Sequence, residues 1–380
     1  MKMLRGTARN LPRPVVARVE DIHTDARGIS HLLRTREKDL PHILLRSGAP
    51  NPGVFAHPSL LLGTPIRFSP GDILRLSPSG ECFRLYEESA NDNALFITGA
   101  CNSKCLMCPQ PPTAHCSGYR AELSAMLDLL DPSPVSLGVT GGEPTVAFDD
   151  LVFLMKKIAE THPECHVQLL TNGRALVDYV KAKQLHAMGR NVTYCIPLYS
   201  DVANIHDKLV GVSGAFDQTL EGIGNLLRLG AAIEIRMVVT ALNYKRLPQW
   251  AEFLYRNMPA IVHVAIMGME PIGLARTNLD LLWVEPDTSI AELAAAVRTF
   301  RRQGTPVSLY NYQLCMLPES LRPFAVKSIS GWKVRFAPEC KKCIIQDDCG
   351  GFFFSALAFP DIAVRPVMKQ SEAGHEPSVH

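Results

Sequence analysis

The sequence predicts an α/β protein: a parallel sheet built from repeated strand–helix units, with a small β-rich N-terminal domain and a C-terminal cysteine-rich extension. Three observations predict this. From residue 93 to residue 304, apolar runs of strand length alternate with segments of helical periodicity. The first 92 residues instead contain short apolar runs separated by turn residues. Residues 305–366 contain four cysteines and little helical periodicity.

Residues 1–92 are expected to form the β-rich domain. The segments 71–76 and 82–86 are rich in β-forming residues, and the turn sequence Ser77-Pro78-Ser79-Gly80 separates them. This arrangement is typical of a β-hairpin. Two further apolar stretches, 41–46 and 60–68, favour a mainly β domain.

Residues 93–304 are expected to form six strand–helix units. The expected strands are 94–98, 135–140, 166–171, 192–199, 233–240 and 262–268. The expected helices are 120–131, 149–161, 176–188, 215–229, 246–258 and 289–302. This alternation implies parallel strands joined by right-handed crossovers, with the functional loops at the carboxyl ends of the strands. Residues 305–366, opened by a strand at 306–310, form the extension, and the polar tail 367–380 is expected to be disordered.

Composition excludes several classes of function. A hydrophobic fraction of 47% and a charged fraction of 20% are ordinary for a globular protein, and a net charge of +2 does not favour nucleic acid as a partner. No apolar run reaches the roughly 20 residues of a membrane span, and the N-terminus lacks the apolar stretch of a signal peptide. We therefore expect a cytoplasmic protein with no membrane partner, in which eleven cysteines indicate metal binding rather than disulfides.

The first cysteine group is Cys101, Cys105 and Cys108, with the spacing C-x3-C-x2-C. Three thiolates on one short loop can bind three irons of a [4Fe–4S] cluster. No fourth cysteine follows at a usual spacing, since Cys116 is eight residues further on, so the fourth iron would accept an external ligand. The alternative is a zinc site that His115 completes.

This loop, placed directly after a strand, resembles the signature of the radical S-adenosylmethionine (SAM) superfamily. The resemblance implies a partial (β/α)6 TIM-like barrel for residues 93–304. It also implies that SAM binds the open iron and that the reduced cluster cleaves it to methionine and a 5′-deoxyadenosyl radical, which abstracts a hydrogen atom from the substrate. The protein then has to seat the cofactor, tune its potential and exclude solvent.

The same resemblance assigns SAM-binding roles to loops that follow later strands. Residues 139–144 resemble the family's GGEP motif, in which the glycines let the backbone approach the ligand and the glutamate binds the amino group of SAM. Residues 171–173 resemble its T-N-G sequence, and residues 197–200 resemble its ribose-contacting region. The candidate residues are Gly141, Gly142, Glu143, Pro144, Thr171, Asn172, Ser200 and Arg236.

Two of these candidates leave alternatives open. Arg236 points either inward, towards the SAM carboxylate, or outward as a solvated charge on its strand. Backbone groups of residues 267–271 could meet the adenine, and turn chemistry between strand and helix is the alternative explanation for every one of these loops. No general acid or base can be named.

The second cysteine group is Cys340, Cys343 and Cys349, with Cys315 upstream. Four thiolates suffice for a second [4Fe–4S] cluster or for a structural zinc ion. The pattern resembles the auxiliary-cluster regions, of the SPASM or shorter twitch type, in radical SAM peptide-modifying enzymes, but it has fewer cysteines than a full SPASM domain, so we expect one auxiliary cluster. The other cysteines, Cys82, Cys116, Cys165 and Cys195, are expected to be ordinary thiols.

The flanking sequences resemble the radical SAM maturase, component C, of the His-Xaa-Ser system. They are Gln110-Pro111-Pro112, Met269-Glu270-Pro271 and Cys349-Gly350-Gly351-Phe352-Phe353. This resemblance implies a peptide or protein substrate, a second radical SAM maturase as partner and a reductase or flavodoxin-type electron donor. An auxiliary cluster further favours an oxidative modification. The alternatives are a radical SAM enzyme that acts on RNA or a small molecule, and a non-catalytic partner of a second radical SAM protein.

Overall fold

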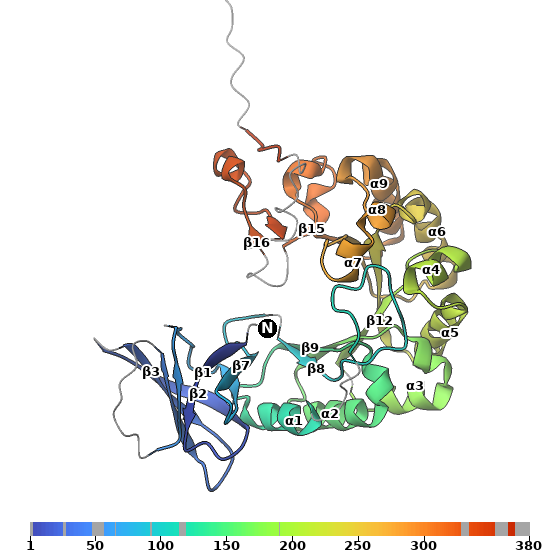
Figure 1. Ribbon diagram of the computed structural model, residues 1–380. Coiled ribbons are helices and arrows are strands. Elements are labelled where there is room, and N and C mark those ends of the chain that lie inside the picture. The colour runs from blue at the N-terminus through green and yellow to red at the C-terminus, as the bar shows by residue number, and fades with distance from the viewer. Residues whose placement is uncertain are drawn as a thin grey trace, which may run out of the picture. The chain divides into compact units, whose positions relative to one another are not determined.

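A computed structural model describes residues 3–25, 28–47, 57–64, 66–91, 93–113, 119–189, 191–327, 334–353 and 364–368. Figure 1 shows its helices and strands. The contacts between residues divide the chain into two compact units. Unit 1 comprises residues 1–102, 112–194 and 228–231, and unit 2 comprises residues 103–111, 195–227 and 232–380. One division between the units follows Asn102, inside the first cysteine loop. The domain boundaries expected from the sequence stay a prediction.

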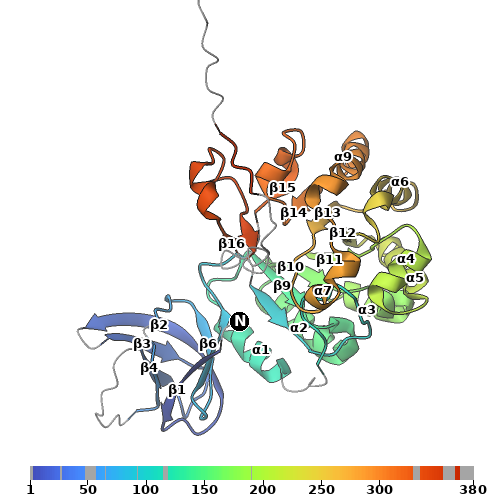
Figure 2. The ribbon, with the colours of Figure 1, turned by 45° about the horizontal axis from the view of Figure 1, so that its top comes forward.

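The N-terminal part of unit 1 is a closed seven-stranded barrel with the strand order β1-β5-β4-β3-β2-β6-β7 (Figure 2). Its strands are β1 (Leu4–Arg9), β2 (Val15–Asp25), β3 (Gly28–Arg34), β4 (His42–Ser47), β5 (Ser59–Leu62), β6 (Ile73–Leu76) and β7 (Glu81–Tyr86). Alternating residues such as Val19, Leu33 and Leu45 are fully buried and form its core. The predicted hairpin is confirmed, because β6 and β7 pair antiparallel with Leu76 opposite Cys82.

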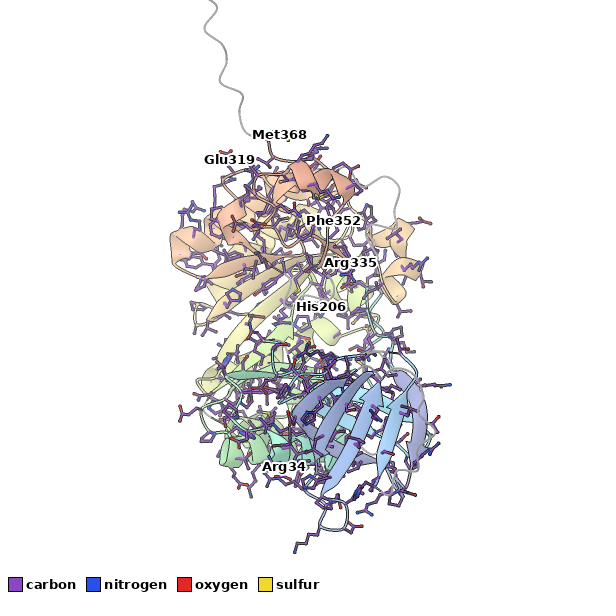
Figure 3. The ribbon with its side chains drawn as sticks, turned by 90° about the vertical axis from the view of Figure 1, so that its left-hand side faces the viewer. Arg34, His206, Glu319, Arg335, Phe352 and Met368 are labelled. Atoms are coloured by element: carbon purple, nitrogen blue, oxygen red, sulfur yellow. The ribbon has the colours of Figure 1, made fainter. Side chains whose placement is uncertain are left out.

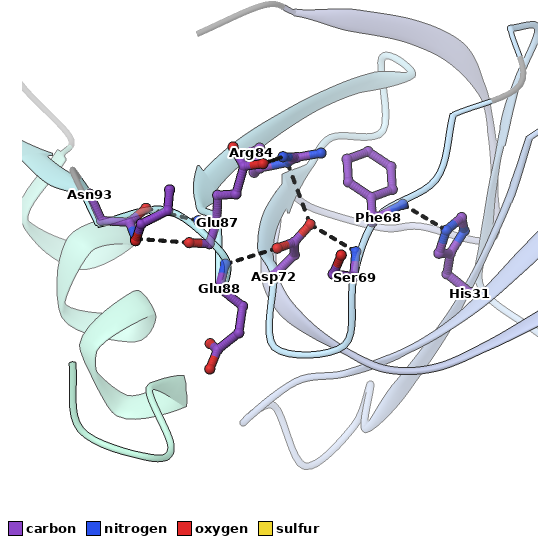
Figure 4. Close-up of polar contacts among 9 residues, drawn as sticks. His31, Phe68, Ser69, Asp72, Arg84, Glu87, Glu88 and Asn93 are labelled. Carbon is purple, nitrogen blue, oxygen red and sulfur yellow. Dashed lines mark hydrogen bonds and ion pairs between the residues drawn. The ribbon is translucent and has the colours of Figure 1, made fainter. Parts of the chain in front are cut away.

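A buried carboxylate stabilises the end of the barrel from which the chain continues towards the sheet (Figure 4). Asp72 is 1% exposed and accepts hydrogen bonds from the backbone amides of Ser69 and Glu88, each at 3.0 Å. Arg84 lies 3.5 Å from the same carboxylate, which compensates its charge. The Asn93 side chain bonds both the amide and the carbonyl of Glu87 and so orients the chain that enters the next strand.

Unit 1 continues with the first strands of the sheet, β8 (Ala94–Phe96), β9 (Ser136–Thr140) and β10 (His166–Leu170). These strands are parallel neighbours, with Ala94 opposite Gly138 and Ser136 opposite His166. The helices are α1 (Tyr119–Leu129), α2 (Phe148–Thr161) and α3 (Tyr179–His186), with short 3-10 turns at Pro144–Ala147 (η1) and Arg174–Val177 (η2). Helix α1 contacts the barrel strands β2 and β6, and an ion pair of 2.9 Å joins Arg75 to Glu122.

Unit 2 contains the later strands, β12 (Ala232–Val239), β13 (His263–Gly268), β14 (Val307–Tyr310) and β15 (Ala325–Val326), which are parallel neighbours in sequence order. Strand β11 (Val192–Pro197) has its first half in unit 1 and its second half in unit 2. A small antiparallel pair, β16 (Val334–Arg335) and β17 (Phe352–Phe353), follows. The helices are α4 (Ala203–Val210), α5 (Ala215–Arg228), α6 (Leu247–Asn257), α7 (Leu274–Thr277), α8 (Leu279–Leu282) and α9 (Pro286–Gln303). The 3-10 turns are η3 (Tyr244–Arg246), η4 (Leu314–Met316), η5 (Arg322–Phe324) and η7 (Pro338–Lys342).

Strand β12 shows why this part of the sheet has two different faces. Ile233, Ile235 and Met237 are buried against hydrophobic neighbours, whereas the alternate residues Glu234 and Arg236 are only partly buried on the opposite face. Helices α6 and α9 pack side by side in this unit (Figure 2), with the rings of Trp250 and Phe300 in edge-to-face contact. The apolar alternation therefore sets which face the helices cover.

The α/β class, the parallel pairing and the β-rich N-terminal region are confirmed, and the (β/α)6 barrel stays a prediction. The sequence reasoning missed the short helices α4, α7 and α8. The helix expected at 176–188 is divided into a 3-10 turn and α3, because the Asp178 side chain accepts hydrogen bonds from the amides of Val180 and Lys181 and begins a new helix there. Within the described part of the chain, every helix is too short or too polar to cross a membrane.

Candidate functional site

The glycine loop after β9 packs against the chain that leads into the first cysteine group. The amide of Gly142 donates to the carbonyl of Thr98 at 2.7 Å, and the amide of Glu143 donates to the carbonyl of Ala100 at 2.8 Å. A Cβ on Gly141 would lie 2.6 Å from the Thr98 carbonyl oxygen, and one on Gly142 would lie 2.3 Å from that of Ala100. The two glycines therefore permit close contact with the protein's own backbone, a requirement that the sequence reasoning had assigned to the ligand.

The Glu143 side chain is buried, with 1% of its surface exposed, and binds protein groups. Its Oε1 accepts hydrogen bonds from the Thr145 amide at 3.0 Å and from the hydroxyls of Thr145 and Thr171, each at 2.6 Å. Its Oε2 accepts one from the Asn172 amide at 2.6 Å. The carboxylate thus joins the loop after β9 to the loop after β10, and Pro144 begins the buried turn that follows it.

The loop after β10 in turn holds Asn102, the neighbour of Cys101. The Asn172 side-chain amide donates to Asn102 Oδ1, and Arg174 Nη1 donates to the Asn102 carbonyl, both at 2.6 Å. A third bond, from the Arg174 amide to Asn172 Oδ1 at 3.1 Å, orients the asparagine. Within unit 1, contacts therefore run from Glu143 through Asn172 to the start of the cysteine loop.

In unit 2 the rest of that loop lies against α4 and the segment before α7. The amides of Lys104 and Leu106 donate to the carbonyls of Val210 and Leu209 at 3.0 and 2.9 Å. Gly211, at φ +71°, and Gly273, at φ +54°, provide the space: a Cβ on either would lie 2.5 Å from a carbonyl oxygen of the loop.

Cys105 and Cys108 lie on this supported segment, and the amide of Cys108 donates to the carbonyl of Cys105 at 3.1 Å. Cys101, Cys105 and Cys108 are all partly exposed. Burial raises the pKa of the Cys108 thiol, and a backbone hydrogen bond at Gln110 opposes this. The alternative zinc ligand His115, and Cys116, lie outside the described residues.

Two further SAM candidates have protein partners. Ser200 is fully buried, and its hydroxyl accepts a hydrogen bond from the Val202 amide at 3.1 Å, which begins α4. Arg236 Nε donates to Glu234 Oε1 at 2.5 Å. Burial and Glu234 act in opposite directions on Arg236, and the net effect raises its pKa.

Glu234 belongs to a polar network that the sequence reasoning missed. His263 Nδ1 lies 2.8 Å from Glu234 Oε2, and its Nε2 lies 2.9 Å from the Ser308 hydroxyl. Burial opposes ionisation of Glu234, but the hydrogen bond from His263 and the charge of Arg236 outweigh it and lower the pKa of Glu234 to about 2. The network crosses β12, β13 and β14 on the face that holds Arg236. Its sequence signal was the repeated placement of a polar residue early in each of these strands.

The four C-terminal cysteines, Cys315, Cys340, Cys343 and Cys349, line one small pocket in unit 2. The Val367 amide donates to the Cys343 sulfur, and the Gly351 amide donates to the Cys349 sulfur, each at 3.4 Å. Burial raises the pKa of the Cys315 thiol; a backbone hydrogen bond from Arg365 opposes this, and the other three thiols add to it. Thiols that raise one another's pKa favour a bound cation, which would compensate their negative charge.

Neither cysteine group is a preformed site for a single ion: no three described His, Cys, Asp or Glu side chains converge in that way. Both groups fit a metal through the chemistry of their donors. The first supplies three partly exposed cysteines on a loop supported by backbone hydrogen bonds, and the second supplies four thiols, two of which have backbone amide donors at their sulfurs.

An open cleft lies at the carboxyl ends of β12, β13 and β14. At one end it is lined by Met269, which also packs in the hydrophobic cluster that contains Cys105. At the other end it is lined by Met316 and Phe352, which pack with Cys340. Phe352, labelled in Figure 3, pairs with Arg335 across β16 and β17. The cleft thus extends from the first cysteine loop to the four-cysteine pocket.

The first comparison that bears on this geometry is with protein families. Residues 95–254 match the model of the Radical SAM superfamily. They contain the first cysteine loop, the glycine loop after β9 and the loop after β10. Residues 95–254 are a radical SAM domain. Members of this superfamily use a [4Fe–4S] cluster and SAM for radical chemistry.

Two curated relatives share part of this domain. The chain is 26% identical over 223 residues to Fe-coproporphyrin III synthase of Methanosarcina barkeri, covering 56% of the chain and 53% of that protein. It is 30% identical over 155 residues to AdoMet-dependent heme synthase of Oleidesulfovibrio alaskensis, covering 39% of the chain and 38% of that protein. The chain thus spans about half or less of the length of these relatives.

Two solved structures with bound S-adenosylmethionine are also similar. Streptococcus suis SuiB bound to S-adenosylmethionine matches with a TM-score of 0.47 and 15% identity, covering 60% of this chain and 51% of that one. Native anSMEcpe with bound AdoMet matches with a TM-score of 0.45 and 17% identity, covering 57% of this chain and 63% of that one.

The sequence reasoning missed four residues that support the first cysteine loop of the radical SAM domain and its flank: Asn102, Arg174, Gly211 and Gly273. Asn102 and Arg174 are adjacent in space but 72 residues apart in sequence. Arg174 directly follows the T-N-G sequence, which was a usable signal. Gly211 and Gly273 lie 100 or more residues after the loop, and without an alignment nothing marked them.

Proposed function

We propose that this chain is a radical SAM enzyme that modifies a peptide or protein. The observation that supports this best is the cleft between Met269, on the side of the first cysteine loop, and Met316, on the side of the four-cysteine pocket. A substrate in this cleft would lie at the carboxyl ends of the parallel strands, where such folds place their ligands.

In this proposal Cys101, Cys105 and Cys108 hold the cluster that binds SAM. When bound, this group would supply the radical chemistry that abstracts a hydrogen atom from the substrate. The chain's own residues bind and orient: the buried Met107 and Leu209 pack behind Cys105 and keep water from that side of the loop.

The predicted SAM-binding residues keep their place in the proposal, with roles adjusted to the structure. In this proposal the backbone of Gly141 and Gly142 contacts the methionine part of SAM. Glu143 and Pro144 hold the conformation of that loop. Thr171 and Asn172 link it to the cysteine loop. Ser200 orders the turn before α4 on the ribose side, and Arg236 is directed to the SAM carboxylate by Glu234.

The charge of the cleft favours a peptide over a tetrapyrrole, although two relatives have names of haem-pathway synthases. A coproporphyrin has several carboxylates, and proteins bind such groups with arginine and lysine. The charged residues of the cleft are Glu285, Asp287 and Arg365, and the arginine is already paired with Asp287 at 2.7 Å. The lining is thus acidic overall and better suited to a neutral or cationic peptide.

The finer assignment is to the His-Xaa-Ser maturases, with a second radical SAM maturase and a flavodoxin-type reductant as partners. Cys315, Cys340, Cys343 and Cys349 would then hold a second [4Fe–4S] cluster, with zinc as the alternative. An auxiliary cluster can accept an electron after hydrogen abstraction, which would make the modification oxidative. Zinc at that site together with a product of unchanged oxidation state would rule this part out.

One anaerobic experiment tests the proposal. After reconstitution we expect about eight irons per chain, four in each cluster, and reductive cleavage of SAM to 5′-deoxyadenosine. About four irons and one zinc would leave the SAM cleavage intact and reassign the C-terminal cysteines to structure. Cys105→Ala should abolish cleavage and halve the iron content, whereas Cys165→Ala, outside both groups, should change neither. Cleavage that survives in Cys105→Ala would contradict the central assignment.

A further inference from the structure

His263 is a partly buried residue at the start of β13 that holds a carboxylate on the neighbouring strand. Its Nδ1 lies 2.8 Å from Glu234 Oε2, and Arg236 Nε donates to the other oxygen, Oε1, at 2.5 Å. Burial opposes ionisation of Glu234, but these two partners outweigh it and keep the pKa of Glu234 at about 2. The carboxylate therefore stays charged and is held at both oxygens, which fixes its orientation.

The ring of His263 is fixed from its other side by β14. Its Nε2 lies 2.9 Å from the Ser308 hydroxyl. In the parallel pairing His263 is opposite Glu234, and Ser308 is opposite Ala265, two residues further along β13. Figure 2 shows β12, β13 and β14 as neighbours in the sheet. Hydrogen bonds thus run from Ser308 through His263 and Glu234 to Arg236.

Arg236 lies on the face of β12 that leads to the first cysteine loop. Side chains of a strand alternate between its two faces, so Arg236 and Val238 share one face, about 6.6 Å apart along the strand. Val238 and Cys105 pack against the same hydrophobic cluster. The bond to Glu234 uses Nε, one of the five N–H donors of a guanidinium. Arg236 can therefore be held by Glu234 and still bind a second carboxylate.

Strand pairing gives no reason for this network. Backbone pairing already joins β12 to β13 from Glu234 to Val239, and β13 to β14 from Val264 to Met267. A buried ion pair rarely stabilises a fold more than apolar side chains of similar volume. The network is better explained by the group that it orients, which is the guanidinium of Arg236.

We infer that His263 is a positioning residue for SAM binding, which holds Glu234 so that Arg236 is directed at the SAM carboxylate. This inference rests on the proposed function and on the role given there to Arg236. His263 does not itself contact SAM in this assignment, so its substitution should change SAM affinity only through Arg236. The iron content should not change, because the cluster depends on the cysteine loop.

The test uses reconstituted holoenzyme with SAM alone, measured by calorimetry. His263→Gln keeps a polar group near Ser308 but loses the donor at the Nδ1 position. The SAM dissociation constant should therefore rise about tenfold, the loss of one charge-assisted hydrogen bond. His263→Asn places its side-chain nitrogen where Nδ1 was, and it should restore most of the affinity. The matched control is His166→Gln, because His166 also begins a strand and bonds the next strand, but its partner Thr193 is not a carboxylate.

A double-mutant cycle separates positioning from a general loss of structure. Arg236→Gln removes the guanidinium and should weaken SAM binding at least about tenfold. In that background His263→Gln should have no further effect on SAM affinity, because the group that it positions is gone. Ser308→Ala loosens the ring of His263 and leaves Glu234 unchanged. It should raise the SAM dissociation constant about threefold, and it provides the same test if His263→Gln loses its cluster.

Each contrary result overturns a definite part of this inference. Wild-type SAM affinity in His263→Gln or in Ser308→Ala would show that His263 does not position Arg236, and so would a His263→Asn variant as weak as His263→Gln. Additive losses in the double variant would give His263 a role independent of Arg236. Normal SAM binding in Arg236→Gln would remove Arg236 from the SAM site, and the inference with it, while the radical SAM assignment stands. A wild-type holoenzyme that does not bind SAM would refute the proposed function itself.

Discussion

The Glu143 carboxylate offers the sharpest test of how the radical SAM domain is held together, through the substitution Glu143→Gln. In the native chain this carboxylate receives four hydrogen bonds, three at Oε1 and one at Oε2, and is shielded from solvent. Glutamine has nearly the same shape but only one acceptor oxygen. Its least costly orientation keeps the oxygen towards Thr145 and Thr171 and places the NH2 group against the Asn172 amide.

The magnitude follows from that count. One hydrogen bond to a charged group is lost, which costs about 1.5–3 kcal/mol, and two donors then face each other where the amide and carboxylate had been 2.6 Å apart. The remaining three bonds weaken because their acceptor is no longer ionised. We therefore expect the free energy of local opening of the loop after β10 to fall by about 2–3 kcal/mol relative to the wild type. That corresponds to roughly 30- to 150-fold faster exchange at the Asn172 amide.

Hydrogen–deuterium exchange measured by mass spectrometry reports on this amide directly. The expected result is a selective loss of protection in peptides that cover residues 170–174. Thr171→Val removes one of the three donors at Oε1 and the acceptor of the Gly173 amide, and should cost about 1.5–3 kcal/mol. Glu160→Gln is the control, because Glu160 is exposed and its ion pair with Lys156 is of the weak i,i+4 surface type. Unchanged protection at Asn172 in Glu143→Gln would refute the argument that this carboxylate holds the two loops together.

Three further predictions follow from other contacts. Gly142→Ala would place a Cβ 2.3 Å from a backbone oxygen, so the reconstituted variant should contain less iron than the wild type. The control Gly224→Ala in α5 has open space around the new methyl group, and it should keep its iron and gain about 0.5–1 kcal/mol of unfolding free energy. Equal iron contents in the two variants would contradict this prediction. Burial lowers the pKa of His31 below its ordinary 6.5 (Figure 4), so the unfolded chain takes up more protons and the stability of the barrel should fall as pH drops below about 6.5. His31→Gln should flatten that slope in denaturation curves, and an unaltered slope would assign it to another group. Asp287→Asn removes the ion pair with Arg365 and should increase the rate at which a chelator removes metal from the four-cysteine site. An unchanged rate would show that the ion pair does not hold the C-terminal segment in place.

Sequence patterns predicted the regular parts of the fold because these depend on local periodicity. The strands around β9, β10, β12 and β13 are short apolar runs flanked by turns or helices, and each was placed to within a few residues. Helix α4 was missed because it has only eight residues and a mixed polar composition. A seven-stranded closed barrel could not be distinguished from another β-rich domain, since closure depends on pairings between distant strands such as β1 and β5.

The candidate site shows the same division between local and distant causes. The position of Gly141 and Gly142 after a strand was recognisable from sequence. That their closest neighbours are Thr98 and Ala100 was not, because this contact depends on the path of a different loop. Likewise Glu143 was recognisable as part of a motif, but its burial follows from four donors of which two lie in the loop after β10. Motif reasoning located the residues, and only the packing showed which of them bind the protein itself.

The cleft and the four-cysteine pocket are coupled by one short segment, residues 364–368. Arg365 lines the cleft and pairs with Asp287 there. Two residues later, the Val367 amide donates to the Cys343 sulfur, and the Val367 carbonyl accepts from the Ile344 amide. Hydrogen bonds to sulfur tune the potential of an iron–sulfur cluster. If the pocket holds such a cluster, a peptide that displaces Arg365 will shift its potential, and by linkage the oxidation state of the cluster must change the affinity for peptide by the same factor.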